Sequence, residues 1–204
     1  MSARADAVSR TRQRIIDAAA DRIRGSAEPL ALLDVAARAG VSRATLYRHF
    51  PSVTHLLDAV AADLLARARF GRLLAALEVP DPVQALREVT VAGTGIWAAD
   101  TALVRNLLSM ARVAPEVVPV IDQLERGRQA ALERLAVRLY QEGRLRGGIT
   151  GAVDLLLVVT AFAAWDELHT ARGRPQAAAT AAIVDLAMRA VVADGTEHGG
   201  GPGR

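Results

Sequence analysis

The sequence predicts an all-α protein of about nine helices, and three observations support this fold class. Hydrophobic residues make up 51% of the 204 residues, which is enough to bury a substantial core. Aromatic residues make up only 3%, and alanine, the strongest helix former, is abundant. Apolar residues recur at spacings of three and four rather than in alternation, which is typical of helices.

The first three predicted helices are short and close together in the chain. Residues 9–24 carry an apolar stripe, and a second helix starts near Pro29 and ends at Gly40, a residue suited to the left-handed conformation. Ser42 is placed to cap a third helix by accepting a hydrogen bond from the amide of Thr45, and Pro51 ends it. The spacing therefore predicts a three-helix N-terminal unit.

Six further helices are predicted after Pro51. The fourth runs over residues 52–79 and stops at the Val79-Pro80-Asp81-Pro82 break. The other five are predicted from Pro82 through Trp97, over 101–112, from Pro115 or Pro119 to 141, over 150–170 and over 175–193. Residues 195–204 contain five Gly and one Pro, which predicts a disordered tail.

Composition and charge narrow the possible functions. The chain has no Cys, which excludes disulfides and thiolate metal sites, and no charged and apolar leader, so we expect a cytoplasmic protein. Its longest apolar run, residues 155–165, is too short to cross a bilayer, so we expect no membrane partner. Residues 1–55 hold nine Arg against five acidic residues, whereas the remainder is nearly balanced. A basic N-terminal part favours a polyanionic partner.

Residues 31–50 have the pattern of a helix-turn-helix. Two short helices flank an Ala-Gly-Val-Ser turn, and Leu46 and Phe50 lie on one side of the second helix, where they can anchor it to the first. The opposite side presents Ala44 and Arg48 and can enter a major groove. The alternative is a plain helical hairpin with a solvated basic face.

The same stretch resembles the DNA-binding signature of the tetracycline-repressor (TetR) family. The resemblance rests on residues 35–52, VAARAGVSRATLYRHFPS, followed by Leu56-Leu57, and covers about sixty residues with the preceding Arg-rich helix. It implies a DNA-binding domain over residues 8–69 and a ligand-binding and dimerisation domain over 70–194. It also implies a homodimer that binds a palindromic operator in double-stranded DNA and responds to a small molecule.

The resemblance implies roles for individual residues of the third helix. Thr45, Tyr47 and His49 would contact phosphates, while Arg43, Ala44 and Arg48 would approach base edges. His49 alone is equally consistent with a capping or surface residue. The residues assigned to DNA binding are Ser42, Arg43, Ala44, Thr45, Tyr47, Arg48 and His49.

Three positions depart from the family pattern. Ala44 stands where Gly is common, Val53 where a phosphate-binding Lys is expected, and Leu30-Ala31 where a Thr or Ser usually caps the second helix. The Arg-rich segment could compensate by reaching the DNA backbone or minor groove, although a solvated arm is an equal alternative for Arg4. The arginines concerned are Arg4, Arg10, Arg12 and Arg14.

The C-terminal part carries no motif of comparable specificity. Gly93-Thr94-Gly95 interrupts a helical segment next to Trp97, which predicts a kink or a close helix approach, and a kinked helix can line a cavity. Tight packing without a cavity is the alternative. The candidate ligand residues are Phe70, Leu74, Thr94, Trp97, Leu103, Asn106, Leu107, Met110, Tyr140, Phe162 and Trp165. Because this set is largely apolar, we expect a hydrophobic effector.

The last helix is too apolar to be covered by one domain core, which predicts a second buried face. Together with the preceding helix it suggests a two-fold interface between two copies of the chain. The candidate interface residues are Val153, Leu156, Leu157, Thr160, Ala164, Ile183, Leu186, Ala187 and Ala190.

The sequence therefore favours a ligand-responsive DNA-binding regulator, with repression as the expected mode. A ligand-independent DNA-binding or scaffold protein is the first alternative. A small helical enzyme is the second alternative, but we expect no enzymatic activity. Asp166 and His169 are the one candidate metal pair, and the sequence has no phosphate-binding loop or nucleophile motif. No cofactor and no metal are expected.

Overall fold

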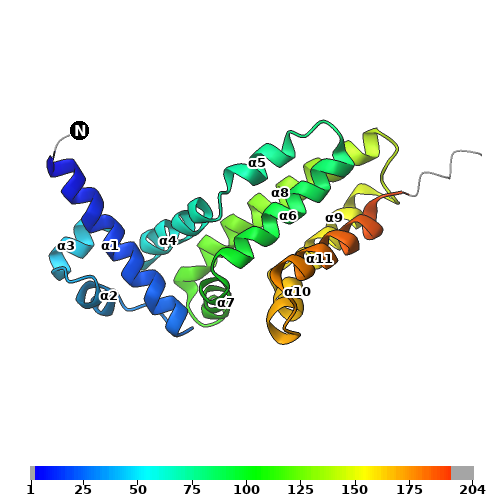
Figure 1. Cartoon of the computed structure of the whole chain (residues 1–204). Helices are drawn as coiled ribbons and strands as arrows, with labels where there is room; N and C mark the ends of the chain where they lie inside the picture. The colour runs from blue at the N-terminus through cyan, green and yellow to red at the C-terminus, as the bar shows by residue number, and fades with distance from the viewer. Residues whose placement is uncertain (1–2, 194–204) are drawn as a thin grey trace, which may run out of the picture. The chain divides into compact units, whose positions relative to one another are not determined.

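The computed structural model describes residues 3–193, and the side chains it describes begin at Ala5 (Figure 1). Within residues 3–193 there are eleven α-helices, one 3₁₀ turn, one π turn and no strand beyond an isolated bridge between Leu145 and Val192. The predicted all-α class is confirmed. The predicted disordered tail lies outside the described residues.

The helices fall into two compact units, and the first is discontinuous in sequence. It comprises the chain up to Ala68 together with Ala99–Glu125, whereas residues 8–69 alone were predicted as the first domain. Its elements are α1 (Ala3–Gly25), α2 (Leu32–Arg38), α3 (Arg43–His49), α4 (Val53–Arg67), α7 (Thr101–Met110), a 3₁₀ turn (Pro115–Val117) and the start of α8 (Val118–Gln141).

The central helix of the first unit is α1. It packs against α2, α4 and α7, and it buries Ile15, Ala19 and Ile23, whose spacing of four residues places them on one face. Leu57 and Val60 of α4 are fully buried in the same unit. The sequence stripe that predicted α1 is therefore its packing face.

The second unit comprises Arg69–Ala98 and the chain from Arg126 onward. Its elements are α5 (Gly71–Leu77), α6 (Pro82–Ala99), most of α8, α9 (Ile149–Val159), α10 (Phe162–Asp166), a π turn (Glu167–Ala171) and α11 (Gln176–Val191). Its core contains Leu86, Leu135, Leu139, Leu156 and Ala187, and α9 lies beside α11 (Figure 1).

Two of the nine predicted helices were wrong, because each is broken in two. The helix predicted over 52–79 ends at Arg67, and Arg69 takes a left-handed φ of 56° before α5 begins. The helix predicted over 150–170 stops at Val159, where Ala161 is extended with ψ of 151°.

Side-chain hydrogen bonds hold the break between α9 and α10. The Thr160 hydroxyl donates to the Leu156 carbonyl oxygen at 2.7 Å, and Arg128 Nη1 donates to the Leu157 carbonyl at 3.2 Å and to Thr160 Oγ1 at 3.1 Å. The Leu156 carbonyl also accepts from the Thr160 amide at 3.0 Å, whereas the Leu157 carbonyl is satisfied by Arg128 in place of the Ala161 amide that a continuous helix would supply. Apolar periodicity does not reveal such a capping arrangement.

No single helix among the described residues is long and apolar enough to span a bilayer. The bent pair Ile149–Val159 and Phe162–Ala171, with a 42° bend, meets the length and composition criteria jointly.

Candidate functional site

The turn between α2 and α3 has the geometry that the sequence predicted. Gly40 has φ of 61°, in the left-handed region, and the Val41 amide donates to the Ala36 carbonyl at 3.0 Å. Arg14 of α1 reaches across to this turn, where its Nη2 donates to the carbonyl oxygens of Ala39 at 2.6 Å and Gly40 at 3.2 Å. The end of α2 is thus fixed to α1.

Ser42 caps α3, as predicted. Its Oγ accepts a hydrogen bond from the Thr45 amide at 3.1 Å and donates to Thr45 Oγ1 at 3.0 Å. Leu46 and Phe50 are almost completely buried, so they anchor the inner side of α3. The helix is therefore fixed both at its start and along its inner face.

The outer side of α3 forms the candidate nucleic-acid interface. Arg43, Ala44, Tyr47 and Arg48 are exposed, and Thr45 and His49 are half-buried. The Arg43 guanidinium lies over the Tyr47 ring at 5.4 Å from its centroid, a cation–π geometry that orders both side chains. This face presents two guanidinium groups and a phenol hydroxyl, donors suited to phosphates and base edges.

His49 lies at the end of α3 in a basic environment. Partial burial, Arg48 and Arg12 lower the pKa of its imidazole from the usual 6.5. The Arg12 guanidinium lies 5.0 Å from the centroid of the Phe50 ring. A phosphate at this position would meet positive charge from both α1 and α3.

The structure shows the surroundings of the positions that depart from the family pattern. Ala31 precedes α2 and makes no side-chain capping bond, so that cap is absent. Val53 begins α4, which Ser52 caps by accepting from the His55 amide at 3.3 Å. In the Arg-rich segment, Arg14 is bound to the turn and Arg12 lies on Phe50, while Arg10 is exposed. The side chain of Arg4 lies outside the described residues.

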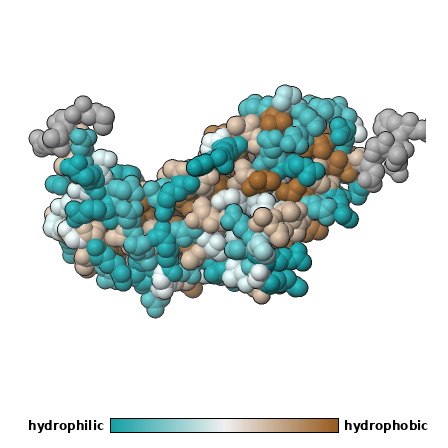
Figure 2. Space-filling view, in the orientation of Figure 1, coloured by the Kyte–Doolittle hydropathy of each residue, from teal (hydrophilic) through white to brown (hydrophobic). Residues whose placement is uncertain are grey.

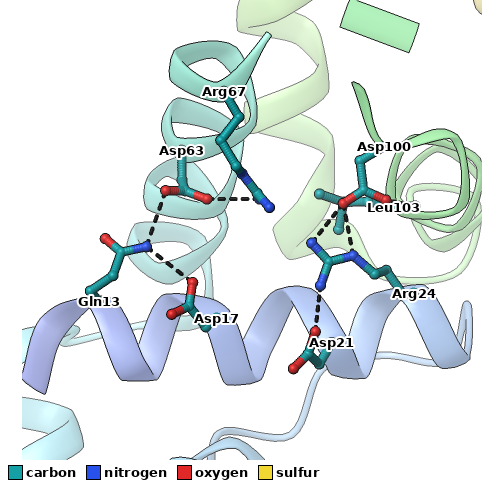
Figure 3. A network of polar contacts seen from close by, with 8 residues as sticks. All are labelled: Gln13, Asp17, Asp21, Arg24, Asp63, Arg67, Asp100 and Leu103. Carbon is teal, nitrogen blue, oxygen red and sulfur yellow. Dashed lines mark hydrogen bonds and ion pairs between the residues drawn. The ribbon is translucent and has the colours of Figure 1, made fainter. Parts of the chain in front are cut away.

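A polar network fixes α1 to α4 and α7 (Figure 3). Gln13 Nε2 donates to Asp17 and to Asp63, each at 3.1 Å, and Asp63 pairs with Arg67 at 2.7 Å. Asp100 caps α7 by accepting from the Leu103 amide at 3.2 Å.

The same network contains Arg24, which pairs with Asp100 at 2.7 Å and with Asp21. The hydrogen bond that the Arg24 guanidinium donates to the Asp100 carboxylate is the main cause of the raised pKa of Arg24.

Four of the candidate ligand residues belong to this first unit. Leu103, Leu107 and Met110 are buried in its core, and Asn106 Nδ2 donates to the α1 carbonyl oxygens of Ile23 at 2.7 Å and Arg24 at 3.0 Å. They hold α7 on the end of α1. Asp100, which makes the key ion pair, was missed by sequence reasoning; its position just before a helix was the available signal.

The structure brings four other candidates together in the second unit. Trp97 and Phe162 meet edge to face with ring centroids 5.8 Å apart, and Phe162 lies 6.4 Å from Trp165. The Thr180 hydroxyl donates to Thr94 Oγ1 at 3.1 Å. The His169 ring, which sequence reasoning assigned to a polar helix end, lies 4.6 Å from the Trp165 ring. We call Trp97, Phe162, Trp165 and His169 the aromatic cluster.

The remaining ligand candidates do not take part in these contacts. Leu74 and Tyr140 are exposed, and Phe70 is a half-buried residue at the start of α5. They were chosen as apolar or aromatic side chains of the C-terminal part, and residue type alone does not reveal which of them face the interior.

The interface candidates need correction. Val153, Leu156, Ile183 and Ala187 are buried within their own unit, so they present no surface to a partner. Leu157, Thr160, Ala164 and Ala190 are half-buried, and Leu186 is exposed. The exposed apolar residues of α9, Leu155 and Val158, were missed because only the burial of their neighbours distinguishes them.

The metal-pair candidates are engaged in local bonds. Asp166 Oδ1 accepts from the Thr170 hydroxyl at 2.6 Å, and His169 Nδ1 lies 2.9 Å from the Arg174 carbonyl oxygen. Between residues 3 and 193, no group of three or more His, Asp or Glu side chains is placed to hold a metal ion.

Comparisons with known proteins agree with this geometry. Residues 15–60 match the model of the bacterial regulatory proteins of the tetR family. This match spans α1 to most of α4, the elements that build the candidate interface. A search of curated proteins finds no match.

Solved structures share the fold of about nine-tenths of the chain. A protein from Syntrophomonas wolfei described as a TetR-family transcriptional regulator has a TM-score of 0.73 at 14% identity, covering 89% of this chain and 95% of its own. The SmeT–triclosan complex has a TM-score of 0.70 at 20% identity, and the match covers 91% of this chain and 93% of SmeT. A Clostridium perfringens protein described as a fatty acid metabolism regulator has a TM-score of 0.69 at 16% identity, and the match covers 89% of this chain and 100% of that protein.

A Ser-capped α3 with a basic outer face, anchored on α1 and α2, defines a helix-turn-helix DNA-binding regulator. Residues 15–60, which build this interface, match the tetR family of bacterial regulatory proteins, and the chain shares the fold of solved structures described as TetR-family regulators.

Proposed function

We propose that the protein is a cytoplasmic, dimeric transcriptional repressor that binds a palindromic operator through α3 and is released by a small hydrophobic molecule. The observation that carries DNA recognition is the outer side of α3, where Arg43, Tyr47 and Arg48 are exposed on a helix fixed at its start by Ser42. Arg can pair bidentately with guanine, and hydroxyls can bind phosphate.

Dimer formation is supported by the exposed apolar residues of the neighbouring helices α9 and α11. Val158 is 69% exposed and Leu155 and Leu186 are each 48% exposed. On the face shown in Figure 2, hydrophobic patches gather over the second unit, whereas the first is mostly hydrophilic. A helix-turn-helix dimer binds two half-sites about one DNA turn apart, which accounts for the palindrome.

Ligand response is supported by the aromatic cluster and by one relative. The cluster combines three large apolar rings with few polar groups, a composition common in small-molecule sites. The SmeT complex contains triclosan, a hydrophobic aromatic molecule bound by a protein of the same fold.

Selection of binding sites from random duplex DNA tests the proposal. We expect a palindromic motif whose two halves are centred about 10 base pairs apart or a multiple of that spacing. Enrichment of a single non-repeated half-site would contradict the dimeric operator. Absence of any enriched sequence would contradict sequence-specific recognition by α3.

A further inference from the structure

We infer that the aromatic cluster takes a flat, uncharged aromatic molecule with a hydrogen-bond acceptor, and that the indole Nε1–H of Trp165 donates to this acceptor. The inference rests on the proposed ligand response and names the chemical class of the ligand. All four residues of the cluster belong to the second unit, on α6, α10 and the π turn.

The donor is the best-defined feature of the cluster. Trp165 is fully buried, yet its Nε1 has no hydrogen-bond partner among the described residues. A buried indole N–H normally has an acceptor, because burying the N–H without one is unfavourable. A ligand oxygen that accepts this hydrogen bond would satisfy the group.

The rings around Trp165 define the rest of the ligand. The rings of Phe162 and His169 lie next to the indole with centroids 6.4 and 4.6 Å away, at interplanar angles of 39° and 33°. Aromatic faces at these angles favour another planar ring. The four cluster side chains include no carboxylate, ammonium or guanidinium group to neutralise a charged ligand, so an uncharged ketone, ether or quinone fits best.

The backbone around Phe162 and Trp165 consists of short elements rather than one long helix. Phe162 follows the extended residue Ala161, and α10 has only five residues before the π turn. Short irregular elements rearrange at a lower cost in free energy than long helices. We therefore expect Phe162 to reorient and admit a ring while α9 and α11 stay in place.

A pair of small molecules isolates the contribution of the hydrogen bond. 1-Indanone and indane have nearly the same shape, but only 1-indanone has a carbonyl oxygen. The chain has two tryptophans, Trp97 and Trp165, so a proton–nitrogen NMR spectrum shows two indole signals, which Trp97→Phe assigns. Titrating each compound into the full-length protein without DNA measures both affinity and the position of each signal.

We expect 1-indanone to bind about 2- to 10-fold more tightly than indane, the range of one neutral hydrogen bond, and to shift the Trp165 indole proton downfield. Trp165→Phe should abolish the preference, whereas Trp97→Phe, which changes the cluster but keeps the Trp165 donor, should change both affinities together and keep their ratio.

Equal affinities in the wild-type protein, an unmoved Trp165 signal, or failure of both compounds to bind would overturn the inference. The NMR shift keeps the test valid if Trp165→Phe does not fold. Because DNA is absent, these outcomes leave the operator selection unaffected. Conversely, failure of the operator selection would refute DNA-binding regulation but would leave the result of the ligand titration unchanged.

Discussion

Asp100 pairs with Arg24 at 2.7 Å and at the same time caps α7, so one carboxylate fixes the start of α7 to the end of α1. The Asp100 side chain is 10% exposed, so this is a largely shielded interaction. Asp100 is also the one residue between α6 and α7 and lies three residues after Trp97 of the aromatic cluster.

Replacing Asp100 should separate its two roles. Asp100→Asn keeps an oxygen that can cap α7 but removes the charge, and we expect it to lower the free energy of unfolding by about 1 kcal/mol. Asp100→Ala loses the cap as well and should cost about 2 to 3 kcal/mol. Urea unfolding at a fixed protein concentration measures both. Equal losses for the two variants would show that the cap contributes nothing.

Arg14 should stabilise the turn of the helix-turn-helix. Arg14→Met keeps the apolar stem but leaves the Ala39 and Gly40 carbonyl oxygens without their donor, so we expect a loss of about 1 to 2 kcal/mol of stability. The control is Arg10→Met on the same helix, at an exposed position. Urea unfolding should show a smaller loss for the control, and matching losses would contradict this role.

Recognition residues should differ in how they affect sequence preference. If Arg43 or Arg48 reads a guanine, its replacement by Ala should weaken binding to the selected DNA site by about 1 to 3 kcal/mol. The same change should relax the base preference at one symmetric position of the two half-sites. Tyr47→Phe keeps the ring under Arg43 and removes only the hydroxyl, so it should weaken binding to all DNA sequences by the same factor.

Titrations on the selected site and on a scrambled duplex at several salt concentrations separate these effects. Losing a phosphate contact from Arg should reduce the salt slope by about 0.9. Sequence-independent losses for both Arg variants would mean that neither reads a base.

His49 should make stability depend on pH in a defined direction. Its pKa is lowered from 6.5 in the folded protein, so the unfolded chain binds the proton more readily. The contribution of neutral His49 is therefore fully present above about pH 6.5 and is lost as the pH falls through the unfolded and then the folded pKa.

His49→Gln cannot titrate and should lose less stability than the wild type on acidification. Urea unfolding between about pH 8 and about pH 5 compares the two proteins. The reverse order would contradict the lowered pKa.

Leu186→Arg should convert a dimer into monomers and weaken operator binding. A charged side chain in the centre of an apolar interface is buried without a partner, which is strongly unfavourable. Leu74→Arg is the matched control, because Leu74 is exposed to a similar degree but lies on α5. Light scattering at micromolar concentration measures the mass. A dimer that survives Leu186→Arg would place the interface on another surface.

The local elements of the DNA-binding unit were predictable because their signals are local. Gly40, Ser42 and Pro51 punctuate the chain within a few residues, and Leu46 and Phe50 show the buried side of α3. The breaks after Arg67 and Val159 were not predictable. The second depends on Arg128, which is 32 residues from Thr160 in sequence.

The candidate site was predictable only where one helix determines it. The exposed side of α3 follows from its own periodicity, but which face of α9 or α11 is free depends on the packing of the second unit. Leu156 and Val158 are equally apolar in the sequence, yet one is fully buried and the other largely exposed. Spacing along one helix cannot distinguish them.

The discontinuity of the first unit determines how its DNA-binding activity can be transferred to another protein. A fragment that ends near Arg69 would include the matched residues 15–60 but lack α7. The Ile23 carbonyl oxygen would then lose its donor Asn106, and Arg24 would lose its partner Asp100. A chimaera that borrows only the N-terminal segment should therefore be prone to aggregation, and a usable graft must carry Ala99–Glu125 as a second piece.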